Sequence, residues 1–393
     1  MKRQVLKSNS AIVVVGDAPA WKINQETGRL LSLVQNCDFS ITNDRQKIKQ
    51  IGSQSYSVNN VARAPEVSLS LDYYLTPYIN NELLFGFNGQ SSTYEPAFSN
   101  IKSRNQNIYL IVDTDDERDG VDQFKTGGED FSGYNALTFG NCYVNKYSVS
   151  YQLNNIPIVS VGLAASNARF ESLTGNEIPI PAINSVSGNN SGYGFLDLTT
   201  LNNTLDSGYI SGYSDGRSEY NAPVAVSNAS SFYLQNLQVG GVNLDAQESP
   251  ILQSFSLDID LARTSLYGLG SNYVYDRKLQ YPINGQVQIV CLVSGVSSGN
   301  FESILNSESG YSLEVAFCDS QKLSTGFYKI QNAKLDSVNY AMQINNIMQF
   351  NAAFSFEIND ESGFLIKREP FVAAWQNMNI AWQDLTINWS EAF

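Results

Sequence analysis

The amino-acid sequence predicts a mainly β protein built from two tandem copies of one β-sandwich or half-barrel domain. Three observations lead to this prediction: two sequence blocks recur in the same order, apolar and polar residues alternate along many short segments, and the composition suits strands. The 393 residues include 22 Tyr and 20 Phe, while charged residues make up only 16%. Such a composition favours strands and turns over long helices.

The first recurring block has the pattern Arg-x-x-aliphatic-x-x-aliphatic-Gly-Ser-amide. It occurs as RQKIKQIGSQ at 45–54 and as RTSLYGLGSN at 263–272. Alternating segments, which are typical of half-buried strands, stand before and after each occurrence. These segments are 37–41 and 67–71 in the first copy, and 255–259 and 287–291 in the second. Each copy is therefore expected to have two strands joined by a long hairpin excursion, over 42–64 and 260–281.

The second recurring block aligns without a gap. It reads FGNCYVNKYSVSYQLNNIPIVSVGLAA at 139–165 and IQNAKLDSVNYAMQINNIMQFNAAFSF at 330–356. An aliphatic-Asn-Asn-Ile sequence lies at the same place in both, at 153–156 and 344–347, with alternating segments on either side. Asn tolerates the left-handed conformations that hairpin turns need. Each copy is expected to end in a strand, a turn and another strand.

One short helix is expected in each copy, after the strand that follows the excursion. The candidates are YINNELLFGF at 78–87 and NFESIL at 300–305. A β-sandwich that carries one short helix accommodates this order of elements.

The repeats divide the chain into four parts. These are a first domain (1–170), a linker or long loop rich in Gly, Ser and Asn (171–230), a second domain (231–360) and a C-terminal extension (361–393). The extension places Trp375, Trp382 and Trp389 seven residues apart. This spacing keeps one face of a helix but changes face in a strand, so it leaves the conformation open. The three Trp residues are candidates for a partner interface or for a cap on the domain's own core.

Composition argues against several classes of protein. The chain has no histidine, which is the commonest general base and metal ligand, so we expect no enzyme. The net charge of -14 repels polyanions and argues against a protein that grips nucleic acid by its phosphates, although DNA could slide past it. No apolar run reaches the roughly 18 residues of a membrane-spanning helix. The cysteines lack metal-site or redox spacing and are expected to be free thiols: Cys37, Cys142, Cys291 and Cys318.

An acidic stretch contains Asp115, Glu117 and Asp119, in an order close to the opening of a calcium-binding loop. The twelfth position of that loop would need a bidentate Glu, and here it is Thr126. These residues are therefore weak metal candidates, and a solvated acidic loop is the preferred interpretation. No cofactor is expected.

The order strand, long hairpin excursion, strand, short helix and paired strands resembles the tail-tube domain, or major tail protein, of bacteriophages and related contractile injection machines. In that family a small β-sandwich with one helix joins its neighbours in a ring around a lumen. The resemblance implies that a duplicated domain forms trimeric, pseudo-hexameric rings, which stack into a tube for DNA ejection. It implies a virion protein that is assembled in the host cytoplasm. Its partners would be copies of itself and other tail proteins, such as terminator, tape measure and baseplate, with DNA only a transient passenger and no membrane.

The resemblance also implies that the two excursions carry ring stacking. The residues concerned would be Arg45, Ile48, Ile51, Gly52 and Ser53 in the first copy, and Arg263, Leu266, Leu269, Gly270 and Ser271 in the second. Aliphatic residues three apart in a polar excursion need a cover, which the next ring would supply. The alternative is that these residues pack each hairpin back on its own sheet.

Other functions fit the same sequence. A baseplate hub, a distal tail protein or a tail-terminator ring would share the domain. A receptor- or glycan-binding virion module would use the aromatic residues as a ligand surface. A glycan-active enzyme would need a pair of carboxylates in a cleft, and no pattern in the sequence places such a pair.

Overall fold

The computed structural model is dominated by strands, most of which belong to one large antiparallel sheet, with almost no helix. The prediction of a mainly β protein is confirmed. The structure describes residues 11–16, 25–26, 28–43, 45–49, 51–52, 54, 58–61, 66–76, 79–88, 93–102, 104–113, 131–182, 194–200, 231–235, 238–239, 242–243, 251–268, 274–292, 310–318, 324–341, 349–359 and 362–368.

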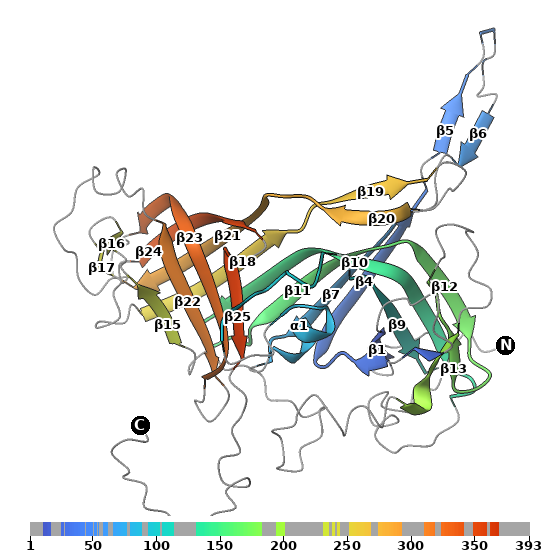
Figure 1. Ribbon diagram of the computed structural model, residues 1–393, viewed down its shortest axis with the longest axis horizontal. Coiled ribbons are helices and arrows are strands. Elements are labelled where there is room, and N and C mark those ends of the chain that lie inside the picture. The colour runs from blue at the N-terminus through green and yellow to red at the C-terminus, as the bar shows by residue number, and fades with distance from the viewer. Residues whose placement is uncertain are drawn as a thin grey trace, which may run out of the picture.

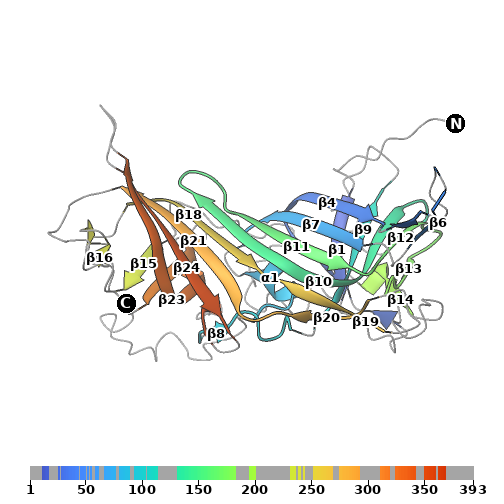
Figure 2. The same ribbon diagram turned by 90° about the horizontal axis from the view of Figure 1, so that it is seen from above.

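The sheet has sixteen strands, and its main path runs in the order β15-β22-β23-β24-β21-β18-β10-β11-β7-β4. These strands are β4 (Val34–Thr42), β7 (Glu66–Tyr74), β10 (Asn135–Gln152), β11 (Ile158–Ala165), β15 (Ser231–Gln235), β18 (Ile251–Asp260), β21 (Ile283–Leu292), β22 (Tyr311–Cys318), β23 (Ser324–Ala341) and β24 (Gln349–Ile358). The N-terminal and C-terminal parts of the chain join where β18 pairs with β10 (Figures 1 and 2). One sheet therefore crosses the whole molecule.

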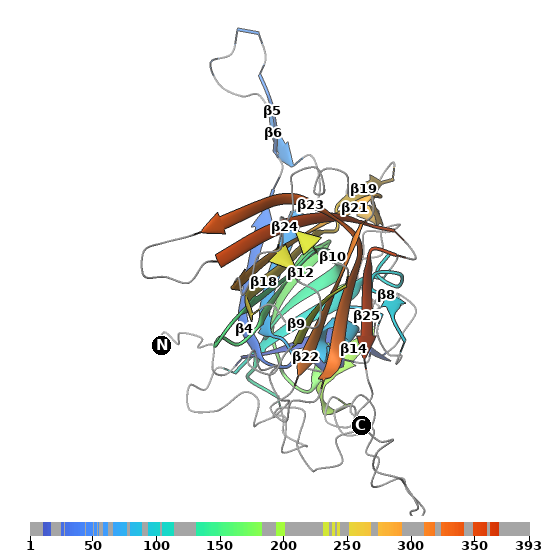
Figure 3. The same cartoon turned by 90° about the vertical axis from the view of Figure 1, so that its left-hand side faces the viewer.

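Two long strands, β10 and β23, each belong to two layers (Figure 3). The first half of β10 pairs with β9 and β12, and its second half pairs with β11 and β18. The first half of β23 pairs with β22 and β25, and its second half with β24. The other strands outside the main path are β1 (Ala11–Gly16), β3 (Gly28–Leu30), β8 (Glu95–Pro96), β9 (Gln106–Val112), β12 (Asn167–Ser172) and β25 (Phe364–Arg368).

Each long strand contains one Asn in the left-handed region between its two halves. Asn141 in β10 has a φ of 52°, and Asn332 in β23 has a φ of 58°. Asn adopts this conformation more readily than most residues, because its short polar side chain can bond locally. The two Asn residues occupy the same position in the aligned sequence blocks, so the two strands change layer at equivalent points.

The strands of the two halves pair in the same register. In β10 and β11, Tyr147 is opposite Val161; in β23 and β24, the corresponding pair is Val338 and Ala352. The irregularity between Val144 and Lys146 recurs in β23, between Leu335 and Ser337. The irregularity between Val34 and Asn36, in β4, likewise recurs between Leu252 and Ser254, in β18. Bulges interrupt a ladder at one defined place, so their recurrence indicates equivalent strands and not merely similar composition.

The predicted elements lie close to the observed ones. The four alternating segments lie within β4, β7, β18 and β21. The helix expected at 78–87 is shorter: α1 spans Asn80–Leu84, and Gly86, with a φ of 87°, follows its end. At the Asn-Asn turn after β10, Asn154 has a φ of 64°. The equivalent turn at 344–347 and the helix expected at 300–305 lie outside the described residues.

The range 171–230 contains more than a linker. Its described residues include β13 (Glu177–Pro179) and β14 (Phe195–Asp197), which pair with each other, and β14 also pairs in parallel with β2 (Gln25–Glu26). Ile178, Leu196 and Leu198 are buried in a hydrophobic cluster with residues of β1 and β9. A few well-placed aliphatic residues therefore anchor a segment that reads as polar overall. The extension at 361–393 similarly begins with β25, which pairs with β23.

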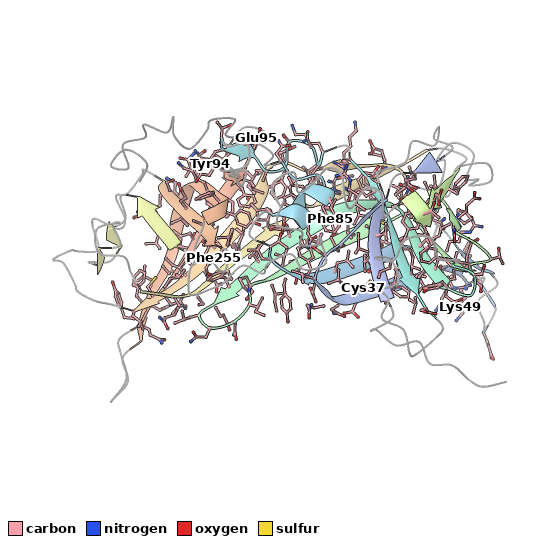
Figure 4. All side chains as sticks on the ribbon, turned by 90° about the horizontal axis from the view of Figure 1, so that it is seen from below. Cys37, Lys49, Phe85, Tyr94, Glu95 and Phe255 are labelled. Atoms are coloured by element: carbon pink, nitrogen blue, oxygen red, sulfur yellow. The ribbon has the colours of Figure 1, made fainter. Side chains whose placement is uncertain are left out.

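The main hydrophobic cluster contains side chains from both halves of the chain. Phe85, at the end of α1, lies near the middle of the molecule (Figure 4) and is almost completely buried. Tyr73, Tyr147 and Tyr328 are fully buried in the same cluster and come from β7, β10 and β23. Within the described ranges, no helix has the length and hydropathy needed to cross a membrane.

Candidate functional site

The two hairpin excursions have the same pairing register. β5 (Arg45–Ile48) and β6 (Val58–Val61) place Arg45 opposite Val61, and β19 (Arg263–Tyr267) and β20 (Val274–Leu279) place Arg263 opposite Leu279. Their positions differ: β5 and β6 project away from the body, whereas β19 and β20 run along the sheet (Figures 1 and 3). The described members of the two predicted stacking sets therefore lie on hairpins that are placed differently relative to the sheet.

Arg263 anchors the second hairpin to its own chain. Its Nε donates to the carbonyl oxygen of Val144 at 2.8 Å and its Nη2 to that of Ile101 at 2.8 Å. Its Nη1 donates to the carbonyl oxygens of Lys102 at 3.2 Å and Arg277 at 3.0 Å. The guanidinium carbon also lies 5.2 Å from the ring centre of Tyr143. These contacts match the alternative in which the hairpin packs on its own sheet.

The environment of Arg263 indicates a structural anchor. Burial lowers the pKa of its guanidinium to about 10, and the guanidinium still carries its charge at neutral pH. Arg277, on the partner strand, is 3% exposed, and its Nη2 donates to the carbonyl oxygen of Ala165 at 3.1 Å. Two arginines thus tie the hairpin to the backbone of the first half of the chain.

In the first hairpin, the residue equivalent to Arg263 is not buried. Arg45 is exposed, Ile48 is 51% exposed, and Ile51, in the loop between β5 and β6, is fully exposed. Gly52 follows with a φ of 86°, a conformation that glycine adopts without strain. Two isoleucines on a polar arm are apolar surface that a partner could cover.

The remaining predicted residues are distributed unevenly. Leu266, on β19, is 36% exposed. Several others lie outside the described residues: Ser53, Leu269, Gly270, Ser271, Trp375, Trp382, Trp389, Asp115, Glu117 and Asp119. Among the residues that are described, no group of three or more His, Cys, Asp or Glu side chains is arranged to hold a metal. Of the cysteines predicted to be free thiols, Cys37, Cys142 and Cys291 are free, and burial raises the pKa of each; the side chain of Cys318 lies outside the described part of the structure.

One face of the sheet from β24 to β4 is open and polar. Along the strands from β24 to β7, alternate residues are largely buried on the core side, and the residues between them point away from the core; β4 alternates in the same way but is more exposed. The outward residues are mostly small or amide side chains. Acidic side chains occur repeatedly among them, namely Asp38, Glu66, Asp72, Asp258, Asp260 and Glu357. Lys146 lies among them, with its Nζ 3.9 Å from Asp258.

A hollow lies on this open face beside the second hairpin. Side chains from both halves of the chain line it, including Asp38, Glu66, Lys146, Asp260 and Arg277. The hollow is wide and open, unlike the enclosed, mostly apolar cleft of a typical small-molecule site. It is better described as part of a continuous polar surface.

Two strand edges of the sheet, at β4 and at the second half of β23, leave core-facing residues accessible. β4 is the last strand of the main path and pairs only with β7 among the described strands. Phe39 and Ile41, on its core-facing side, are 39% and 42% exposed, although the ring of Phe39 also contacts Phe139 and Phe170. The second half of β23 pairs only with β24 among the described strands, and Tyr340 in it is 40% exposed. An open strand edge is a template for pairing with another chain.

A buried carboxyl group lies between the two halves of the molecule. The hydroxyl groups of Tyr73 and Tyr147 donate to Glu82 Oε1 at 3.1 and 3.4 Å, and the hydroxyls of Tyr147 and Tyr328 lie 2.6 Å apart. Burial raises the pKa of Glu82 to about 7, and the hydrogen bonds partly oppose this rise. Glu82 has no solvent exposure, so it cannot act on an external substrate in this conformation.

Sequence analysis missed two of these features. The signal for the buried carboxyl was a single Glu within the apolar run of YINNELLFGF. The open edge had no signal, because β4 and its buried equivalent β18 alternate in the same way.

Comparison with known proteins finds no family model and no curated protein that matches the chain. A function can therefore be inferred only from the geometry of the open face, the projecting β5–β6 hairpin and the strand edges.

Proposed function

We propose that this protein is a virion structural protein that assembles into stacked rings to form a bacteriophage tail tube, through which DNA is ejected. The observation that carries the proposal is the sheet from β23 to β4. It crosses both halves of the chain with one face packed on the core and the other open, polar and acidic. A surface of this kind suits the wall of an aqueous channel.

Charge supports the same proposal. Asp38, Asp258 and Asp260 are exposed on the open face, and the whole chain carries a net charge of -14. A negatively charged wall repels DNA phosphates and limits adhesion during passage. DNA is then a passenger and not a bound ligand, and the protein has no enzymatic role.

The repeated register supports a duplicated tube domain. We assign one domain to 1–170 and the other to 231–360, each a β-sandwich of the tail-tube type with a long hairpin. Two equivalent domains in each chain allow a trimeric ring to have pseudo-sixfold symmetry. Cyclic assembly of this kind needs one repeated contact between neighbouring domains.

The projecting hairpin β5–β6 supports stacking between rings. Ile48 and Ile51, on the projecting β5–β6 arm, are apolar and exposed, and the next ring would cover them. The β19–β20 hairpin takes less part, because Arg263 already binds its own chain. Terminator, tape-measure and baseplate proteins would be partners at the ends and inside the tube.

Electron microscopy with light scattering over a concentration series tests this proposal. We expect hollow rings with three chains each, stacking into tubes at high concentration. Ile51→Asp should prevent stacking but leave single rings, and Ser68→Asn, a neutral polar change on the open face, is the matched control. Rings that never stack would instead favour a tail-terminator or hub protein. A monomer at every concentration would overturn the proposal.

A further inference from the structure

We propose that the edge strand β4 of one copy pairs with the second half of β23 of the next copy, antiparallel and in a defined register. This inference rests on the proposed self-assembly, and it identifies the strands through which neighbouring copies bind each other. The partner is a second copy of this chain, and the contact joins two different surfaces.

The register comes from a contact that already exists within the chain. β18 pairs with the second half of β10, with Ile259 opposite Tyr147 and Leu257 opposite Val149. The shared irregularities and pairings make β4 the equivalent of β18, and β23 the equivalent of β10. The same contact between copies would place Ile41 opposite Val338 and Phe39 opposite Tyr340.

Burial distinguishes the β18–β10 contact, which forms within the chain, from the unpaired edge of β4. Ile259 and Leu257 are 0% exposed, whereas the equivalent Ile41 and Phe39 are 42% and 39% exposed. All four residues point to the core side of the sheet. They differ because β10 covers the edge of β18, while no described strand covers the edge of β4. Pairing with a second copy would remove this apolar surface from water.

The second half of β23 is a suitable acceptor. Ser337–Ala341 pair with β24 on one side, and no described strand pairs with the other side. Tyr340 packs edge-on against Phe350, with ring centres 5.5 Å apart, and it is still 40% exposed. A ring from the adjacent copy could stack beside it, as aromatic pairs across strands do.

The outward residues of the proposed contact are compatible as well. Ser40 would lie opposite Asn339, and Thr42 opposite Ser337, so no like charges meet. Directly opposed like charges destabilise strand pairs, whereas small polar pairs can exchange hydrogen bonds. Within the chain, the equivalent pairs are Lys146 opposite Asp260 and Ser148 opposite Asp258, and Lys146 also lies diagonally 3.9 Å from Asp258.

The two halves of the chain thus define a rotation that the next copy can repeat. The contact is heterologous, so repetition produces a closed ring or an open filament. Two β4 edges in contact would instead produce a symmetric dimer, which is a separate and testable outcome.

Engineered disulfides test the register directly. The double variant Ser40→Cys/Asn339→Cys places two thiols directly opposite each other, and opposed residues of antiparallel strands have Cα atoms about 4.5–5.5 Å apart, within disulfide range. Under mild oxidation we expect a ladder of linked chains that ends at the closed ring. Neither single variant should form it, because the two positions lie on different surfaces. Links formed by Ser40→Cys alone would overturn the proposal in favour of a β4–β4 contact.

A matched control sharpens the test. Ser68 is opposite Ser40 on β7, one strand further from the edge, and their hydroxyls lie 2.7 Å apart. The variant Ser68→Cys/Asn339→Cys should form no links. Rings or tubes in the microscope without a disulfide between the two engineered thiols of Ser40→Cys/Asn339→Cys would overturn the register and leave the proposed function standing. A monomer with no links at any concentration would overturn both.

A charge on the edge provides a second test. Ile41→Lys should abolish assembly and leave the circular dichroism spectrum unchanged, because the side chain is already 42% exposed in the single chain. Normal rings formed by Ile41→Lys would contradict the proposed contact.

Discussion

The two hairpins share a register but not an environment. β19–β20 is held by Arg263 and Arg277, which donate to backbone carbonyls of the first half of the chain. β5–β6 carries Arg45 at the position of Arg263, yet it projects into solvent. The comparison teaches that one local structure can serve two purposes. The hairpin β19–β20 contacts the first half of its own chain and holds the two halves together. The hairpin β5–β6 projects into solvent and is available to a partner.

The same contrast holds at the sheet edge. Mutation of the two equivalent isoleucines, Ile259 and Ile41, should give the largest difference in stability. Ile259→Ala removes a fully buried side chain and should lower the free energy of unfolding by about 2–5 kcal/mol. Ile41→Ala, at the equivalent but exposed position, should cost under about 1 kcal/mol in dilute monomeric protein. Urea denaturation measures both. Equal losses would show that β4 is covered within the single chain.

The carboxyl group between the halves should make stability depend on pH. The pKa of Glu82 is raised from 4.5 to about 7, so the folded state binds this proton more tightly than the unfolded chain does. The contribution of Glu82 to the free energy of unfolding is therefore greatest below pH 4.5, and it is lost as the pH rises from 4.5 through about 7. Glu82→Gln should raise the free energy of unfolding above pH 7 by on the order of 3 kcal/mol and flatten the profile between the two pKa values.

The neighbouring phenols do not share this titration. Tyr73, Tyr147 and Tyr328 have pKa values raised well above 10 by burial, so they stay protonated throughout the window. The measurement is the free energy of unfolding of the unmodified protein and of Glu82→Gln, obtained by denaturation at a series of pH values. Glu66→Gln, at an exposed position, is the control. A profile unchanged by Glu82→Gln would show that the carboxyl group does not titrate there.

A third difference lies in one pair of opposed core residues, in which the larger side chain is on one strand in the first half and on the other strand in the second half. Val67 is opposite Ala165 in the first half, and the equivalent pair is Gly285 and Phe356. A Cβ on Gly285 would lie 2.2 Å from Cζ of the Phe356 ring, which is buried. Gly285→Val should therefore cost about 1–3 kcal/mol by overpacking.

A compensating change sharpens this comparison. The double variant Gly285→Val/Phe356→Ala recreates the pair of the first half and should be more stable than the sum of the two single losses predicts. Thermal unfolding of the four proteins forms the double-mutant cycle. Strict additivity would mean that the two sites are not coupled by size.

The smallest expected effect separates the two hairpin arginines. Arg263→Ala should lower the free energy of unfolding by about 1–2 kcal/mol, because buried carbonyl groups lose charged donors while a desolvated charge is also removed. Arg45→Ala should change it by less than about 0.5 kcal/mol, because that side chain is exposed. Proteolysis within β19 and β20 should also become faster in the Arg263 variant alone. Similar behaviour of both variants would contradict the anchoring.

Much of the strand arrangement could be predicted from residues. The gap-free match of the second block predicted a strand, a turn and a strand in each copy, and the structure adds that β10–β11 and β23–β24 share their register and an irregularity. The first block implied two hairpins of similar length. Helix length was harder, because apolar residues continue to Phe87 while Gly86 turns the backbone into the left-handed region. The buried strands β13 and β14 were missed since their few aliphatic residues lie among Gly, Ser and Asn.

The sequence by itself determined a mainly β chain with repeated strands, two hairpins and an Asn turn after β10, because these depend on alternation and on local backbone preferences. It could not determine which edge is open or which hairpin is anchored. Ile41 and Ile259 have the same identity and the same local pattern, and only one of them meets β10. Burial depends on neighbours that are distant along the chain, so only the tertiary structure decided between them.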